Sequence, residues 1–118
     1  CKIVLKGHTA AVTVLVVLSN GQLASAADDC TIRIWDIDTG ECQQVLMGHS
    51  EAVRALLQMP DGHLASGAAD ATIRIWDTQT WECSKVLTGP TGSVENLVLM
   101  VNGHMASGSY DQTIRLWC

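Results

Sequence analysis

Short runs of alternating apolar and polar residues recur along the chain, and each run predicts a β-strand. In TIRIW (72–76) the two isoleucines alternate with threonine, arginine and tryptophan. Alternation with period two indicates a strand, and the β-branched content favours a strand over a helix. Strands are also predicted for CQQVL (42–46), VRALLQM (53–59) and HLASGAA (63–69). No segment has a helical periodicity, so we expect an all-β fold.

Turn residues separate these runs. Asn20-Gly21, Asp61-Gly62 and Asn102-Gly103 each stand between two predicted strands. Asn or Asp followed by Gly supplies the positive φ angles that tight hairpin turns require. We therefore expect four short strands per unit, joined as hairpins.

The strands and turns belong to a repeat of 41 residues. Gly7, Gly48 and Gly89 are each 41 residues apart. Other positions keep the same register: Cys1, Cys42 and Cys83; Leu5, Leu46 and Leu87; Ser25, Ser66 and Ser107; Asp29, Asp70 and Asp111; Trp35, Trp76 and Trp117. A fixed period of this length is the signature of a repeat architecture. The chain thus divides into three repeats, approximately 1–41, 42–82 and 83–118.

The ends of each repeat resemble the WD40 family. A Gly-His pair begins the unit and a Trp-Asp pair ends it, at Gly7-His8 and Trp35-Asp36 and at Gly48-His49 and Trp76-Asp77. The third repeat has Gly89-Pro90 and Trp117-Cys118 in these places. The resemblance implies a β-propeller built here from three four-stranded antiparallel blades, arranged radially about a channel.

The resemblance also implies a hydrogen-bonded set of His, Ser, Asp and Trp within each blade. His and Trp donate, Ser relays, and the carboxylate accepts, so no buried polar group stays unpaired. Bonds of this charge-assisted kind are worth roughly 1.5 to 3 kcal/mol each. Pro90 replaces the third His, so we expect that set to be the least well fixed unless a neighbour or water completes it. The expected tetrads are His8, Ser25, Asp29 and Trp35; His49, Ser66, Asp70 and Trp76; and Ser107, Asp111 and Trp117.

Ser, His and Asp together also suggest a hydrolase, but the repetition favours a structural role. A catalytic triad occurs once in a fold, beside a cleft and an oxyanion hole. We therefore expect no catalytic residue and no cofactor. His63 and His104 follow turn glycines, and Cys1, Cys42 and Cys83 should lie on separate blades, so no metal site is expected either.

The family resemblance places partners on the face that carries the Gly-His turns. Three positions per blade point to this face, and Asp28, Arg54, Glu95 and Tyr110 are the ones able to recognise a ligand. Arg33, Arg74 and Arg115 either support their own blade edges or form a basic ring. Trp81, in a loop, is either a packing cap or an interface anchor. The full top-face set is Ala11, Thr13 and Asp28; Ala52, Arg54 and Ala69; and Ser93, Glu95 and Tyr110.

Composition narrows the possible environments and partners. The formal net charge is −5 and there is no basic run, so no nucleic-acid partner is expected. The longest apolar run, 14–18, is too short for a membrane span. Five cysteines without a CxxC pair favour reduced thiols in a cytoplasmic, intracellular setting. Because the chain begins with Cys1, we expect it to be processed, trimmed or part of something longer.

Three blades leave a propeller unfinished, since about four to eight are needed to close one. The last repeat stops at Trp117 without an outermost strand, and the segment 2–5 matches such a strand. We therefore expect a homo-oligomer of two or three copies, in which 2–5 pairs with 113–117 of a neighbour. The alternative is that the remaining blades lie in a longer propeller.

The leading functional hypothesis is a non-catalytic scaffold that holds a protein or peptide. The alternative is a self-assembling structural module or propeller fragment, including an engineered one, whose main partner is itself. An enzyme with its site in the central channel ranks lowest, because the predicted inner strands offer only Arg54 and Glu95 near one end.

Overall fold

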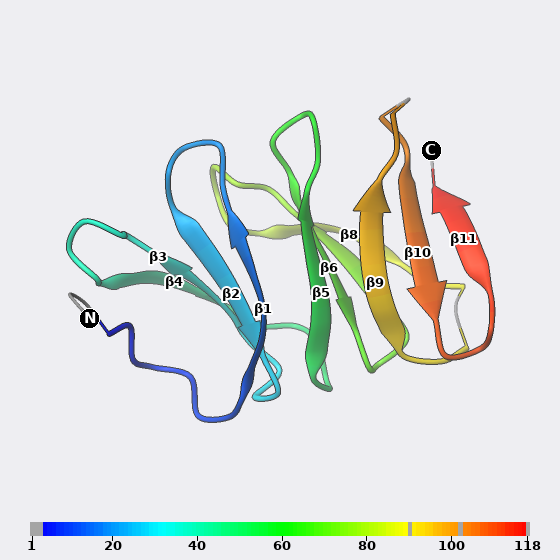
Figure 1. Cartoon of the computed structure of the whole chain (residues 1–118), viewed down its shortest axis with the longest axis horizontal. Coiled ribbons are helices and arrows are strands. Elements are labelled where there is room, and N and C mark those ends of the chain that lie inside the picture. The colour runs from blue at the N-terminus through cyan, green and yellow to red at the C-terminus, as the bar shows by residue number, and fades with distance from the viewer. Residues whose placement is uncertain (1–3, 90, 102, 118) are drawn as a thin grey trace.

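The computed structural model describes residues 4–89, 91–101 and 103–117, and eleven β-strands lie in these ranges (Figure 1). They form three separate antiparallel sheets, so the expected all-β class is confirmed. The first sheet has the order β1-β2-β3-β4. Its strands are β1 (Val12–Val17), β2 (Leu23–Ala27), β3 (Ile32–Trp35) and β4 (Cys42–Leu46).

The second sheet repeats the first, and the third lacks a fourth strand in the described part of the chain. In the first two sheets that strand follows the Trp of β3 or β7, and only Cys118 follows Trp117 in this sequence. The second sheet is β5 (Val53–Gln58), β6 (Leu64–Ala68), β7 (Ile73–Trp76) and β8 (Cys83–Leu87), and the third is β9 (Val94–Leu99), β10 (Met105–Ser109) and β11 (Ile114–Trp117).

The hairpin turns differ in one respect from the sequence expectation. Gly21 and Gly62 take positive φ angles of 90° and 95°, but Asn20 and Asp61 do not. Instead the Asn20 and Asp61 side chains accept hydrogen bonds from backbone N–H groups two residues on, at 2.9 and 3.0 Å. The reason is local: a short polar side chain can close the turn itself, so only the glycine needs the left-handed region.

Each inner strand carries a β-bulge at the same position. Thr13 is the extra residue between the paired positions of β1 and β2. Arg54 and Glu95 are the extra residues in β5 and β9. A bulge turns the added side chain away from the regular alternation of the strand. All three belong to the predicted top-face set.

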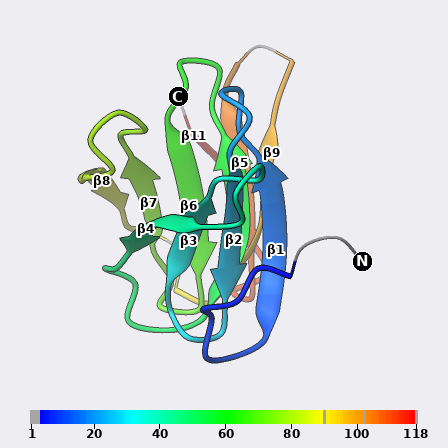
Figure 2. The same cartoon turned by 90° about the vertical axis from the view of Figure 1, so that its left-hand side faces the viewer.

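The apolar core lies between the sheets, in two clusters. One joins the first and second sheets and includes Ile32, Ile34 and Leu56. The other joins the second and third sheets and includes Ile73 and Val94. The inner strands β1, β5 and β9 lie side by side, while β4 and β8 splay outward (Figures 1 and 2). The middle sheet is therefore covered on both faces and the outer two sheets on one.

Candidate functional site

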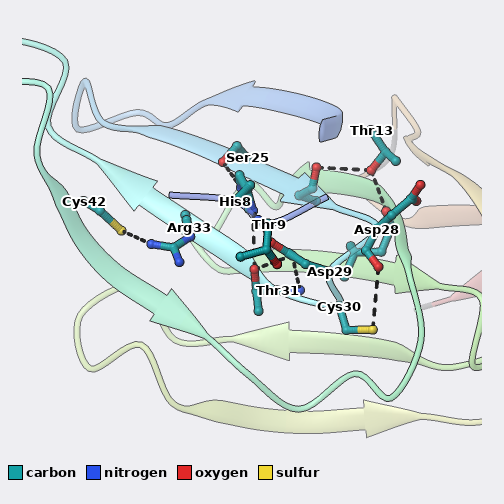
Figure 3. A network of polar contacts seen from close by, with 12 residues as sticks. His8, Thr9, Thr13, Ser25, Asp28, Asp29, Cys30, Thr31, Arg33 and Cys42 are labelled. Atoms are coloured by element: carbon teal, nitrogen blue, oxygen red, sulfur yellow. Dashed lines mark hydrogen bonds and ion pairs between the residues drawn. The ribbon is translucent and has the colours of Figure 1, made fainter. Parts of the chain in front are cut away.

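The four residues of the first predicted tetrad lie together. Figure 3 labels three of them, His8, Ser25 and Asp29. His8 Nδ1 is 2.9 Å from Asp29 Oδ2, and His8 Nε2 is 2.6 Å from Ser25 Oγ. The indole Nε1 of Trp35 donates to the same Ser25 oxygen at 2.8 Å. The turn before β1, the strands β2 and β3, and the loop between them are thus joined at one point.

The chemistry of the groups fixes the direction of these bonds. A carboxylate only accepts, so His8 Nδ1 carries the proton that points to Asp29. In the tautomer with that single proton, Nε2 is an acceptor, so the Ser25 hydroxyl can donate to it while accepting from Trp35. The chain of donors runs from Trp to Ser to His to Asp, and every buried polar atom in it is satisfied.

The second tetrad repeats this geometry. His49 Nδ1 lies 3.0 Å from Asp70 Oδ2, and His49 Nε2 lies 2.7 Å from Ser66 Oγ. Trp76 Nε1 donates to Ser66 Oγ at 2.8 Å. The structure therefore brings together the members of both complete sets.

A threonine that was not predicted from the sequence is a fifth member of the first set. Thr31 Oγ1 donates to Asp29 Oδ1 at 2.6 Å, and the N–H groups of Thr9 and Thr31 donate to the same carboxylate at 3.0 Å. The signal was present, since Thr stands two residues after the Asp in all three repeats. In the second set the same donors to Asp70 are Ser50 N, Thr72 N and Thr72 Oγ1.

These contacts set the ionisation of the carboxylates. Burial alone would raise the pKa of Asp29, but hydrogen bonds from Thr31, Thr9 and His8 outweigh it and hold that pKa far below the ordinary 3.8. The pKa of Asp70 is lowered in the same way. Burial lowers the pKa of His49 below the ordinary 6.5, although Asp70 acts in the opposite direction. In the second set the charged Asp70 and the neutral His49 are therefore the native forms.

Asp111, the carboxylate of the third set, has partly different hydrogen-bond donors from Asp29 and Asp70. Asp111 accepts from the hydroxyls of Ser109 and Thr113, and from both N and Oγ1 of Thr91 at 3.0 and 3.3 Å. Ser109 first, then Thr113 and Thr91, hold the pKa of Asp111 well below its ordinary value. Arg115 Nη2 lies 3.9 Å away. Neighbouring hydroxyls thus hold the Asp of the repeat that was expected to be the least well fixed.

The remainder of the third set is only partly described. Trp117 Nε1 donates to Ser107 Oγ at 2.9 Å, as in the other sheets. Pro90 and Cys118, the two departures from the family pattern, lie outside the described residues.

The connectivity of the first two sets equals that of a hydrolytic triad, with Asp on Nδ1 and Ser on Nε2 of one His. Two features separate them from a catalytic site. Ser25 is 3% exposed and Ser66 is 0% exposed, so a substrate carbonyl has no access to either hydroxyl oxygen. Each oxygen also already accepts from an indole N–H. The geometry suits a buried hydrogen-bonded set that holds together the turn before the inner strand, the second and third strands, and the loop between those two strands.

The arginine of each third strand supports its own sheet. Arg33 Nη1 lies 3.4 Å from Cys42 Sγ, which joins β3 to β4. A Cβ atom on Gly7 would lie 2.8 Å from the same nitrogen, so glycine allows the Gly-His turn to pass close over the guanidinium. The second sheet repeats the arrangement with Arg74, Cys83 and Gly48. These contacts favour support of the blade edge over a basic ring.

The nine predicted top-face residues form three groups at one edge of the sheets, which we call the top face. In each group the first and third members are joined through the backbone, as Asp28 N donates to Ala11 O at 2.9 Å. The matching bonds join Ala69 to Ala52 at 2.8 Å and Tyr110 to Ser93 at 2.9 Å. The second members are the bulge residues Thr13, Arg54 and Glu95.

The first and second groups are also in contact with each other. Thr13 Oγ1 donates to the backbone O of Val53 on the next inner strand at 2.6 Å. Arg54 Nη1 lies 3.8 Å from Asp28 Oδ1, so a weak ion pair bridges the first two sheets on the surface. Tyr110 is largely exposed. The top face therefore carries small residues together with one cation, two carboxylates and one aromatic ring.

Trp81 occupies the turn between β7 and β8. Its φ is 59°, where the first repeat has Gly40 at 76°. The ring is partly buried and packs against the cluster that joins the first and second sheets. This placement favours the packing cap over the interface anchor.

His63 pairs with Asp61 at 3.1 Å and helps to line a hollow of about 220 Å³ between the second and third sheets. Met105 and Trp117 of the third sheet also line this hollow. Across residues 4–89, 91–101 and 103–117, no three His, Cys, Asp or Glu side chains meet as metal ligands. The same ranges contain no helix long and apolar enough to cross a bilayer.

Three antiparallel sheets, each with a Ser–Trp hydrogen bond between its second and third strands, define the blades of a WD40-type β-propeller. The sequence model of the WD domain, G-beta repeat, matches residues 1–36, 40–77 and 81–118, and the chain belongs to this family.

Two curated relatives match over single repeats. Mitochondrial division protein 1 of Schizosaccharomyces pombe is 54% identical over 41 residues, which is 35% of this chain and 6% of that protein. The probable E3 ubiquitin ligase complex SCF subunit sconB of Aspergillus clavatus is 51% identical over 39 residues, 32% of this chain and 6% of the relative.

Two solved structures match nearly the whole chain. The crystal structure of the WD40 beta propeller domain of Doa1 superposes with a TM-score of 0.88 at 30% identity, covering 94% of this chain and 38% of that one. The structure of U3-55K superposes with a TM-score of 0.89 at 31% identity, covering 96% of this chain and 37% of that one. The three sheets are thus arranged as in part of a propeller, and this chain spans well under half of either solved chain.

Proposed function

We propose that the chain is a non-catalytic scaffold that holds a protein or peptide on its top face. The observation that carries the proposal is the repeated bulge, which turns Thr13, Arg54 and Glu95 out of their strands at the same edge. The serines of the two complete tetrads are unavailable to a partner, because Ser25 and Ser66 are buried and hydrogen-bonded within their blades.

The composition of the top face supports a protein partner. Tyr and Arg are the residues that most often dominate binding energy at protein interfaces. Tyr110 is exposed and Arg54 takes part in a surface ion pair, so a partner can cover both side chains. Small residues between them allow a peptide backbone to approach closely.

The test compares three forms of the chain. A double variant Arg54→Ala/Tyr110→Ala removes both anchors, and Lys85→Ala, an exposed change on β8 away from the top face, is the control. A partner captured by the unmodified chain should bind the control equally and the double variant at least about tenfold more weakly. Equal binding of the purified partner by all three forms would place its site elsewhere and contradict the proposal.

A second candidate is a self-assembling module whose main partner is another copy. The exposed apolar faces of the two outer sheets favour it, since such faces are covered by neighbouring repeats in stacked architectures. Copies that associate but retain no other partner would support this candidate over the scaffold.

A further inference from the structure

The top face has an ion pair at one contact between neighbouring sheets and lacks it at the next. We call the contact between the first and second sheets the first junction, and the contact between the second and third sheets the second junction. At the first junction Arg54 Nη1 lies 3.8 Å from Asp28 Oδ1. The counterparts of these two residues, 41 residues on, are Glu95 and Ala69. At the second junction a carboxylate and a methyl group therefore stand in place of the ion pair.

The packing beneath this surface brings Glu95 and Ala69 to the same place. A Cβ atom on Gly67, near the end of β6, would lie 2.5 Å from Val94 Cγ1 at the start of β9. Ala69 follows Gly67 by two residues, and Glu95 follows Val94 directly. The corresponding pair at the first junction, 41 residues earlier, lies in one apolar cluster. The second junction therefore keeps the register of the first, with Glu95 beside Ala69.

The Glu95 carboxylate has no counterion of its own at this junction. Glu95 is partly buried, and within residues 4–89, 91–101 and 103–117 it takes part in no ion pair. Arg54 lies in the bulge of the neighbouring inner strand, but its guanidinium is paired with Asp28 at the first junction. Because a charge that is partly removed from water is costly without a partner, the position suits a cation supplied from outside the chain.

A second negative charge belongs to the same junction. Asp70 directly follows Ala69 and is in its charged form. Its hydrogen-bond donors are neutral groups: the imidazole of His49, the N–H of Ser50, and the N–H and hydroxyl of Thr72. Neutral donors stabilise a carboxylate without cancelling its charge. The two carboxylates therefore favour a basic side chain of a partner over an acidic one.

The junction also leaves room for a basic side chain. Ala69 is partly exposed and ends at Cβ, whereas its counterpart Asp28 extends to a carboxylate. The aliphatic stem of a lysine or arginine can lie over this methyl group while its charged end reaches Glu95. A divalent metal ion fits less well, because it takes about six to eight oxygen ligands, and in the described part of the chain no three His, Cys, Asp or Glu side chains meet.

We propose that the partner places a lysine or arginine side chain over Ala69 at the second junction, where it pairs with the Glu95 carboxylate. The inference rests on the proposed function and specifies the chemistry of the partner. Both sheets that form this junction lie within the described residues, so the two positions are seen with their neighbours in place. The partner thereby repeats at the second junction the pairing that Arg54 makes at the first.

The probe is a phage-displayed library of random peptides, selected on the unmodified chain. Peptides that bind the double variant Arg54→Ala/Tyr110→Ala at least about tenfold more weakly are those held on the top face. Among these peptides we expect a lysine or arginine at a shared position. Replacing it by norleucine, which keeps the apolar stem and removes the charge, should weaken binding at least about fivefold.

Two variants of the chain identify the carboxylate that pairs with this charge. Glu95→Gln removes the charge with little change of shape. Glu51→Gln is the matched control, because Glu51 is an exposed carboxylate in the turn before β5. Glu95→Gln should weaken binding of the basic peptide at least about fivefold and leave binding of the norleucine peptide unchanged, whereas Glu51→Gln should bind both peptides as the unmodified chain does. Far-ultraviolet circular dichroism checks that every form folds.

Three results would overturn the inference while the proposed function stands. The first is a set of top-face peptides that share no basic residue. The second is an equal loss of affinity in Glu95→Gln and Glu51→Gln, which would indicate attraction by the overall negative charge. The third is a norleucine effect that is the same in Glu95→Gln as in the unmodified chain. If no selected peptide depends on Arg54 and Tyr110, the inference and the proposed function both fail.

Discussion

At the scale of single residues, the hydroxyl of Ser66 joins two side chains that burial would otherwise leave unpaired. It accepts from Trp76 and donates to His49, and it is fully buried. An unpaired polar group in such a place costs the protein about 1–3 kcal/mol. The Ser66 hydroxyl therefore contributes to the free energy of unfolding by keeping both partners hydrogen-bonded.

Replacing Ser66 by alanine should therefore lower the free energy of unfolding by about 1–3 kcal/mol. Urea denaturation at neutral pH measures this change. Ser50→Ala is the matched control, because Ser50 is exposed and contributes its backbone N–H to Asp70. A loss no larger than that of the control would show that the tetrad does not stabilise the fold.

The pH dependence of stability follows from the same network. Burial lowers the pKa of His49 below 6.5, so the unfolded chain takes up a proton at a higher pH than the folded chain does. The contribution of His49 is full above pH 6.5 and is lost as the pH falls below it. Asp29 and Asp70, whose pKa values are also lowered, add a second loss that begins near their ordinary value of 3.8.

We expect the free energy of unfolding to fall between pH 7 and pH 5, and to fall again below about pH 4. His49→Gln should flatten the first decrease, whereas His63→Gln should leave it in place because His63 lies in a partly exposed surface pair. Denaturation midpoints measured across this range test the assignment. An unchanged slope in His49→Gln would assign the proton uptake to another group.

At the scale of elements, the sequence predicts strands and repeats well where the two faces of a strand differ. The predicted segment 42–46 equals β4, and 72–76 exceeds β7 by one residue. The inner strand β1 reads VTVLVV, so its apolar pattern has no visible alternation. The bulge at Thr13 and its effect on side-chain direction therefore could not be predicted from periodicity, and the family resemblance supplied the top-face positions instead.

The loop between the second and third strands holds a feature that the sequence conceals. Cys30, Ala71 and Gln112 all take positive φ angles, of 71°, 66° and 68°, without being glycine. The residue types give no sign of it. Each follows the Asp of its tetrad, so bonds to that carboxylate hold the strained turn in place.

Ala71→Gly should therefore stabilise the protein by about 1 kcal/mol, because glycine takes this conformation without a Cβ clash. Thermal unfolding measures the gain. Ala69→Gly, two residues away and outside the positive-φ region, should instead lose stability. Equal effects of the two changes would argue against strain at residue 71.

At the scale of the whole molecule, the three sheets form a stack with a finished interior and two unfinished ends. The middle sheet packs on both faces, while the first and third sheets expose Leu15 and Ile114, whose counterparts Leu56 and Ile73 are buried between sheets. The sequence predicted this incompleteness from the number of repeats.

The central claim is that the top face holds a protein or peptide through Arg54 and Tyr110. Binding of a captured and purified partner to the unmodified chain and to the double variant Arg54→Ala/Tyr110→Ala tests it most directly. The account predicts that the double variant binds at least about tenfold more weakly. Equal affinity of the two forms would contradict it.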